Sequence, residues 1–350
     1  MPINPDTGIW DSTYSPPAPH DLPAVRHYLR EVFAQPEALA FHTQMVKEGR
    51  FSLDLIRSPR PERAAQLILD GERDRLAEAA LYWVSPEMTQ VATAAAVTLP
   101  DDLRIDETHQ PAEHGFIVFA EPIGSYLGDV LGDRRVDIAA ASWGPLAGKP
   151  DATGATFYSV RDDDYVRHSL TRIFGRPPKR AELDTAIRTT PEWLWDNEIT
   201  LHHGSTIADL DAIQELSTLL NGEAVVPWLK VLYASWLLMT QPGISQTEQV
   251  TPNRRLQRRE AREGIRTSEV RIVHVHRRHR DKPTGNQSSD TGDRRYTVRW
   301  LVRGHWRNQP HGPDRSLRRL VWINPQIRGP QDKPLKTGQT VNVWDRPANR

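Results

Sequence analysis

Cysteine is absent from all 350 residues of this chain. Without thiols there can be no disulfide framework, zinc–thiolate site, iron–sulfur cluster or cysteine nucleophile. This absence agrees with a reducing compartment, and we predict a cytoplasmic protein. The chain has 28 prolines and 21 glycines, with 38% hydrophobic and 26% charged residues. These values are typical of a globular protein with proline-punctuated connections, which its length divides into two or three domains.

Long apolar runs are also scarce. The first 21 residues, MPINPDTGIWDSTYSPPAPHD, are polar and proline-rich, which argues against a secretory signal and favours an extended arm. The most apolar stretch, AVVPWLKVLYASWLLMTQ from Ala224 to Gln241, is interrupted by Pro227 and Lys230. We predict that it forms a buried core helix and that the protein has no membrane partner.

Charge is divided unequally along a chain whose net charge is zero. Residues 251–350 contain 24 basic and 9 acidic residues, a net charge of +15, so residues 1–250 carry −15. Arginine greatly outnumbers lysine. Such a division indicates either a basic module that binds a polyanion, which makes nucleic acid the expected partner, or two parts that attract one another or a protein partner.

The pattern predicts an α+β fold in three segments. Residues 1–105 form a polar arm and a helical region, because apolar residues recur three and four apart in RPERAAQLILDGERDRLAEAALYWV and SPEMTQVATAAAVTL. In the first of these stretches Leu76, Ala79, Ala80 and Trp83 would share one helical face. In the second, Ser85 before a proline is expected to cap the helix.

Residues 106–250 are expected to form a mixed α/β segment. Short strands are predicted at GFIVFAEPIG, RVDIAAASWGPL and GATFYSVRD, and helices at YVRHSLTRIFG, TIADLDAIQELSTLLN and GEAVVPWLKVLYASWLLMTQ. The acidic run Asp162, Asp163 and Asp164 could be a magnesium site. Capping of the following helix explains it better, because acidic residues favour the positive N-terminus of a helix.

Residues 251–350 are expected to form a basic linker and an antiparallel, β-rich module. PNRRLQRREAREG reads as a short basic helix that either contacts phosphate or is a solvated linker. Strands are predicted at EVRIVHVHRR, RRYTVRWLVRGHW, RRLVWINP and QTVNVWDR. In the second of them the aromatic and aliphatic residues alternate with arginines, which predicts one core face and one basic face.

The region from Arg299 to Arg319 holds the strongest functional pattern. Guanidinium groups bind phosphate, Asn and Gln bond to base edges, and tryptophan stacks on unpaired bases. The predicted nucleic-acid-binding residues are Arg299, Arg303, His305, Trp306, Arg307, Asn308, Gln309, Arg315, Arg318 and Arg319. His305 or His311 could alternatively serve as the general acid or base of a metal-independent nuclease or toxin-like RNase, beside arginines that stabilise the phosphate. A basic surface that docks on protein is the third alternative.

Two histidine groups invite a metal interpretation. His202 and His203 are adjacent, so on regular structure they point in different directions, and a loop or capping role is expected. His274 and His276 would share a strand face near His279, but arginines surround them and no carboxylate lies close in sequence. We predict no metal site and no cofactor, and the sequence leaves enzymatic activity open.

The segments VRGHWRNQPHGPDRSLRRLVWINPQIRGPQDKPL, LYWVSPEMTQVA and GFIVFAEPIG carry a resemblance that extends over most of the chain. In them the chain resembles conserved uncharacterised proteins of actinobacteria and of their phages or plasmids. The resemblance implies a bacteriophage or other mobile-element context and brings no catalytic residue with it. With the charge pattern, it predicts a nucleic-acid-binding protein of a mobile element, or a factor for host takeover that docks on protein.

Overall fold

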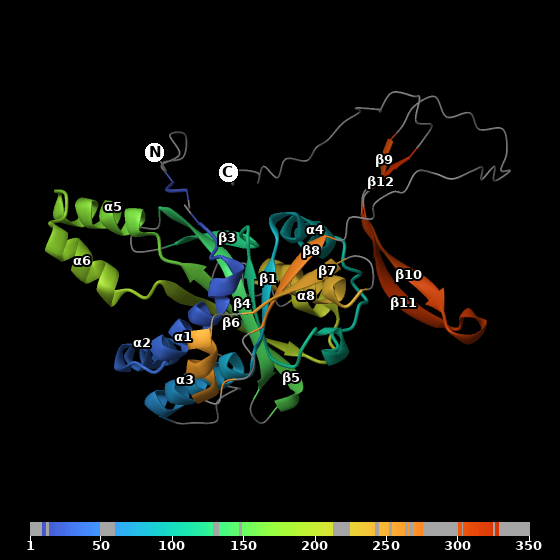
Figure 1. Cartoon of the computed structure of the whole chain (residues 1–350), viewed down its shortest axis with the longest axis horizontal. Helices are drawn as coiled ribbons and strands as arrows, with labels where there is room; N and C mark the ends of the chain where they lie inside the picture. Colours follow the sequence, from blue (N-terminus) through green and yellow to red (C-terminus); the bar gives the residue numbers. More distant parts are fainter. Residues whose placement is uncertain are drawn as a thin grey trace. The chain divides into compact units, whose positions relative to one another are not determined.

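The computed structural model describes residues 9–11, 14–49, 60–128, 133–146, 149–212, 225–241, 245–251, 254–262, 265, 269–275, 300–302, 304–324 and 326–328. The chain divides into two compact units, Met1–His276 and Arg277–Arg350. We call them the body and the C-terminal unit. The structure is α+β, as the sequence predicts (Figure 1).

The body is built on one mixed sheet. Its strands are β1 (Ala80–Val84), β2 (Gly115–Phe119), β3 (Gly124–Gly128), β4 (Arg134–Leu146), β5 (Lys149–Val160), β6 (Trp193–His202), β7 (Ser245–Val250) and β8 (Val270–Val275). The order is β6-β5-β4-β2-β1-β8-β7, with β3 paired to β4. Strand β1 is parallel to both β2 and β8, and the other pairs are antiparallel. The sheet therefore draws strands from all three segments of the sequence.

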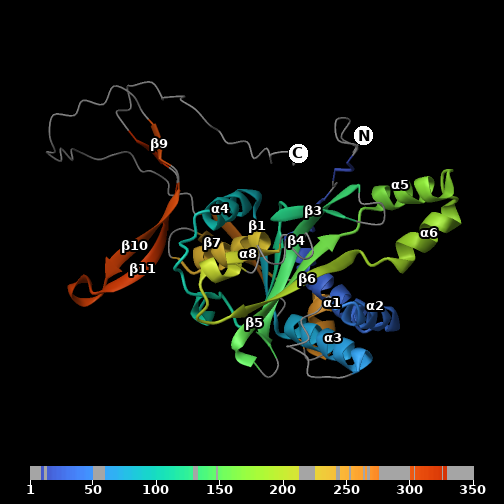
Figure 2. The same ribbon diagram turned by 180° about the vertical axis from the view of Figure 1, so that it is seen from behind.

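Helices cover both faces of this sheet. The described α-helices of the body are α1 (Leu22–Val32), α2 (Pro36–Lys47), α3 (Pro61–Glu78), α4 (Pro86–Ala96), α5 (Asp163–Phe174), α6 (Arg180–Thr189), α8 (Val226–Met239) and α9 (Arg254–Arg262). Figures 1 and 2 show α1, α2 and α3 on one side of the sheet and α4 and α8 on the other. Helices α5 and α6 project as a pair beyond the sheet.

The first long helix ends earlier than its sequence period predicts. Helix α3 stops at Glu78, and ALYWV forms β1 instead of a further helical turn. The predicted shared face of Leu76, Ala79, Ala80 and Trp83 is therefore wrong. Aromatic and β-branched residues suit a strand with neighbours on both sides, and the pairing of β1 with β2 and β8 outweighs the helical period.

Ser85 caps α4 as predicted, because its hydroxyl accepts a hydrogen bond from the Met88 amide at 3.3 Å. Helix α4 then carries the chain back so that β2 lies parallel to β1, which is the arrangement that a crossover helix permits.

Trp143 of β4 packs at the centre of the sheet, between neighbouring strands and α8. Its cross-strand partner is Gly115, and a Cβ on Gly115 would lie 2.1 Å from the indole, so only glycine fits there. The indole packs on Tyr82 and on Trp236 of α8, with ring centroids 5.7 and 5.2 Å away. Most of α8 is buried, as predicted for a core helix.

In the described part of the chain no helix combines the length and hydropathy that crossing a membrane requires.

A charged network lies in the opposite layer, between α3 and the sheet. Glu72 is fully buried and accepts hydrogen bonds from Ser142 Oγ at 2.6 Å, Thr156 Oγ1 at 3.0 Å, the Tyr158 hydroxyl and Arg75. Arg75 Nη2 also donates to Glu198 Oε1 at 2.8 Å. The network ties α3 to β4, β5 and β6. Such a buried pair is stabilising only while all of its partners are present.

The acidic run lies at the N-terminus of α5, as predicted: Asp162 is the cap, and Asp163 and Asp164 are in the first turn. Asp162 Oδ1 accepts from the Tyr165 amide at 3.0 Å, and its Oδ2 accepts from Trp10 Nε1 at 2.9 Å. Trp10 is buried, and its backbone forms a parallel β-bridge with Arg134, the first residue of β4. Residues 9–11 are thus held against β4 and the start of α5.

Helix α9 is not solvated along its whole surface, because one of its residues is buried against α1. Glu260 and Arg26 are 2% and 0% exposed, and Arg26 Nη2 donates to Glu260 Oε1 at 2.7 Å. Arg259 also forms an ion pair with Glu31 at 2.8 Å. Because α9 lacks an apolar face, its attachment to α1 depends on these charges.

Candidate nucleic-acid interface

The basic strand-loop predicted from the sequence is an antiparallel hairpin in the C-terminal unit. It consists of β10 (His305–His311), the turn around η4 (Pro313–Arg315) and β11 (Leu317–Ile323). A further antiparallel pair, β9 (Trp300–Val302) with β12 (Gln326–Arg328), belongs to the same unit. The turn has Gly312, Asp314 and Arg315 at positive φ. Residues 305–323 contain four arginines and one acidic residue.

The register of the hairpin sorts the predicted residues onto two faces, because paired residues point to the same side of an antiparallel sheet. One face carries His305, Arg307, Gln309, His311 and Arg319, with Leu317, Val321 and Ile323. The other face carries Trp306, Asn308 and Arg318, with Pro310, Leu320 and Trp322. We call the first the basic face and the second the tryptophan face. Arg315 belongs to the turn, whereas Arg299 and Arg303 lie outside the described residues.

Side chains on the basic face are open to solvent. His305, Arg307, Gln309, His311 and Arg319 are all exposed. Arg307 Nη2 donates to Gln309 Oε1 at 2.6 Å, so these neighbours on one side of β10 are oriented together. The face thus presents one guanidinium group on each strand, with an amide and two imidazoles on β10, a donor set suited to phosphate oxygens.

The tryptophan face is partly a core. Trp306 and Trp322 are cross-strand partners, and their rings meet edge to face with centroids 5.2 Å apart. Trp322 is 2% exposed. Trp306 therefore packs within the hairpin. Arg318 Nη1 donates to the Arg315 carbonyl at 2.7 Å, which ties it to the turn.

The two candidate catalytic histidines stand at opposite ends of β10. His311 lies six positions after His305, a distance of about 20 Å at the rise of an extended strand. One scissile phosphate cannot lie within hydrogen-bond reach of both imidazoles.

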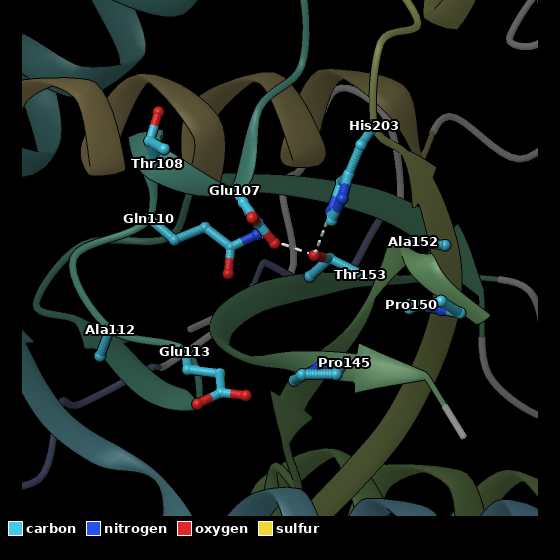
Figure 3. Close-up of a pocket in the computed structure, with 10 residues that line it drawn as sticks. All are labelled: Glu107, Thr108, Gln110, Ala112, Glu113, Pro145, Pro150, Ala152, Thr153 and His203. Carbon is cyan, nitrogen blue, oxygen red and sulfur yellow. Dashed lines mark hydrogen bonds between the residues drawn. The ribbon is translucent and has the colours of Figure 1, made fainter. Parts of the chain in front are cut away.

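A pocket that the sequence analysis did not predict lies in the body. Its volume is about 320 Å³, and Figure 3 shows its lining from the loop after β1 and α4, the ends of β4 and β5, and His203 after β6. Thr153 Oγ1 accepts from Gln110 Nε2 at 2.8 Å and lies 3.0 Å from His203 Nε2. The lining residues are far apart in sequence, so no local motif marks the pocket.

The histidines considered as metal ligands are not joined by further ligands among the described residues. Across the described ranges, no group of three or more histidines and carboxylates is placed to hold a metal ion. His203 lies in a turn, as expected, with Nε2 3.0 Å from Thr153 Oγ1, whereas His202 is the last residue of β6 and not part of a loop. His274 lies on β8, while His276 and His279 lie outside the described residues.

The fold and the site define an α+β protein with a mixed-sheet body and a basic β-hairpin in its second unit. A family model described as "AcrVA2-like: Anti-CRISPR type V subtype A2 family" matches residues 82–329, more than two thirds of the chain. The chain belongs to this family. The match supports the phage or mobile-element context expected from the sequence. No curated protein matches the chain.

Proposed function

We propose that this protein counteracts a type V CRISPR system and that the basic face of the β10–β11 hairpin is the surface with which it binds nucleic acid. The family description supports the first part. The second part is carried by one observation: Arg307, Gln309 and Arg319 are exposed together on one face of the hairpin. Guanidinium forks of this kind bind successive phosphates without reading sequence.

The hairpin offers a matched control within itself. Arg318 and Arg319 are adjacent and both exposed, but they lie on opposite faces. The double variant Arg307→Ala/Arg319→Ala removes both guanidinium groups of the basic face. Arg318→Ala removes the same kind of side chain from the tryptophan face.

The test is binding of the full-length protein to labelled single-stranded RNA, single-stranded DNA and duplex DNA over a salt series. Each phosphate that the protein neutralises adds about 0.7 on a single strand, and about 0.9 on a duplex, to the steepness of log K against log salt. We expect the double variant to reduce this steepness by about 1.4 to 1.8, for two phosphates, and Arg318→Ala to leave it unchanged. Equal slopes for the wild type and the folded double variant would show that this face does not bind the nucleic acid.

Docking on a protein is the second candidate, and Leu317 favours it. This leucine is 53% exposed and is the cross-strand partner of His311 on the basic face. An apolar side chain among arginines is a common arrangement at protein interfaces. If the face docks on protein, Leu317→Ser should weaken co-purification with the type V effector, and it should leave nucleic-acid binding in the salt series unchanged.

Nuclease activity is the third candidate. With the two histidines at opposite ends of β10, either His305 or His311 would have to act with a different partner. Recovery of intact RNA after incubation in chelator would argue against a metal-independent nuclease. Cleavage that His305→Ala or His311→Ala abolishes without loss of fold would establish one.

A further inference from the structure

The outer part of the β10–β11 hairpin is a two-stranded ribbon that is open to solvent on both faces. Among the described strands, β10 and β11 pair with each other alone, and Figure 1 shows them running together to the turn. Every residue from Arg307 to Arg319 is exposed, whereas Trp322 at the base of the hairpin is buried. An isolated two-stranded hairpin is marginally stable in water. A partner that encloses both strands would therefore stabilise this part of the chain.

The width of the ribbon and the positions of its arginines fit the major groove of B-form DNA. Neighbouring strands lie about 4.8 Å apart, and this groove is about 12 Å wide and admits a two-stranded ribbon. Arg307 lies opposite Val321, and Arg319 lies opposite Gln309. The two arginines are therefore diagonal neighbours on different strands, with Cα atoms about 7–8 Å apart. In the groove, each strand of the ribbon would carry one guanidinium group for the phosphate chain on its own side.

The grooves of the other common duplex forms fit this ribbon less well. The minor groove of B-form DNA is about 6 Å wide, which leaves no room for two strands with their side chains. The major groove of A-form RNA is deep and narrow, and side chains do not read the bases in it. The shape of the hairpin therefore favours duplex DNA over duplex RNA.

The aromatic side chains of the hairpin favour a duplex over a single strand. Proteins that bind single strands stack successive bases on exposed aromatic rings. Residues 305–323 contain two tryptophans and neither tyrosine nor phenylalanine. These tryptophans, Trp306 and Trp322, pack on each other edge to face, and Trp322 is buried. The exposed His305 and His311 stand at opposite ends of β10. The hairpin thus presents no row of rings for unpaired bases.

Gln309 lies at the centre of the basic face and offers hydrogen-bond donors. Its Oε1 accepts from Arg307 Nη2 at 2.6 Å, so the carbonyl end of the amide is engaged and the NH2 end is directed to other acceptors. In the major groove guanine presents two acceptors, N7 and O6, whereas cytosine presents a donor. An amide held in this way suits the guanine edge.

On the basis of the function proposed above, we infer that the hairpin binds B-form duplex DNA by lying in its major groove. Arg307 and Arg319 contact the phosphates on the two sides of the groove, and the Gln309 amide donates to guanine between them. The phosphate contacts supply affinity without regard to sequence, and the amide contact supplies a preference for guanine-containing sites.

The first test compares four nucleic acids with the full-length protein at one salt concentration. They are a mixed-sequence DNA duplex, the RNA duplex of the same sequence and the separated DNA and RNA strands. We expect the DNA duplex to bind at least tenfold more tightly than the others, because it alone offers a groove that admits the ribbon. Equal or tighter binding of the RNA duplex or of a single strand would overturn the inference.

The second test replaces guanine with 7-deazaguanine in the DNA duplex, which keeps base pairing and charge and removes the N7 acceptor from the major groove. We expect at least fivefold weaker binding, since a good base contact in this groove discriminates by that factor or more. Gln309→Leu removes the amide without changing charge and should abolish the difference between the two duplexes. Asn308→Leu removes an exposed amide from the tryptophan face and should preserve it. Equal affinity of the wild type for the two duplexes would overturn the inference.

The salt series separates failure of this inference from failure of the proposed function. If Arg307→Ala/Arg319→Ala reduces the salt dependence but RNA binds as tightly as duplex DNA, the basic face binds nucleic acid and the groove assignment is wrong. If none of the four nucleic acids binds, both the proposed surface and the groove assignment are wrong, and docking on protein takes their place.

Discussion

The buried network around Glu72 allows a strong prediction about stability. Replacing Glu72 with Gln keeps the size of the side chain, removes its charge and exchanges one acceptor oxygen for an NH2 donor. That donor would face groups that themselves donate to Glu72, including the Tyr158 hydroxyl, Ser142 Oγ and Arg75. The variant therefore lacks at least one buried hydrogen bond, and Arg75 keeps only one carboxylate partner.

The expected loss of stability depends on the charge that Arg75 keeps when Glu72 is replaced. Burial opposes the charge on Arg75, but the carboxylates of Glu72 and Glu198 outweigh it and raise the pKa of the guanidinium group, so Arg75 stays charged. Removing one partner of a buried ion pair costs about 3–5 kcal/mol. Because Arg75 retains Glu198, we expect Glu72→Gln to lower the free energy of unfolding by about 3 kcal/mol, the lower end of that range.

The assay is urea unfolding of the full chain, followed by near-ultraviolet circular dichroism. Asp70→Asn is the matched control: Asp70 lies on the same helix, is 42% exposed at its side chain and pairs with Arg73 at 3.4 Å. Exposed pairs of this kind contribute about 0.2–1 kcal/mol. A Glu72→Gln variant as stable as Asp70→Asn would refute the claim that this network stabilises the body.

Three further predictions concern the body. Glu260→Ala should destabilise it by about 3 kcal/mol, because Arg26 loses a buried charged partner, and faster proteolysis at α9 would report the release of that helix. Burial raises the pKa of Asp196 to about 6, so folding favours the protonated form. The contribution of Asp196 to stability should therefore be greatest below about pH 4 and fall by up to about 1.4 kcal/mol per pH unit as the pH rises to 6, and Asp196→Asn should remove this contribution from the pH dependence of urea unfolding. Gly154→Ala should destabilise the body, as judged by thermal unfolding, because the added Cβ would lie 2.4 Å from Arg75 Nη1; an unchanged melting temperature would contradict this close approach.

Local signals in the sequence predict local structure well in this protein. The Ser85 cap, the Asp162 cap and the strands β2, β4 and β5 are where short patterns place them. The core helix α8 is predicted by its apolar composition alone. The caps depend on hydrogen bonds between residues that are close in sequence. The core strands and α8 depend on burial of apolar side chains, which needs no particular partner.

Elements that depend on distant partners are harder to predict. β1 reads as a continuation of α3 until β2 and β8 pair with it on both sides. β6 was not predicted, because its sequence WLWDNEITLH mixes charged and apolar residues. Glu198 can lie in this strand because it pairs with Arg75, which is 123 positions earlier in the sequence.

In the candidate site, too, features within one strand could be predicted, whereas features that depend on pairing between strands could not. Alternation along RRYTVRWLVRGHW predicts two faces for one strand, but that predicted strand reaches only the first two residues of β10, whereas β11 overlaps the strand predicted at RRLVWINP. The assignment of Arg319 to the basic face and of Arg318 to the other depends on the register between the strands, which one strand's sequence does not contain. The pocket was missed because its lining residues lie on several separate elements.

The most direct test of the proposed function is interference by a type V CRISPR effector against a targeted plasmid in cells that express this protein. Plasmid survival should be high with the wild type and with Arg318→Ala, and should fall to the level of the empty control with Arg307→Ala/Arg319→Ala at equal protein abundance. Full protection by the double variant would contradict the assignment of inhibition to the basic face of the hairpin. Absence of protection by the wild type would contradict the proposed action against that type V effector.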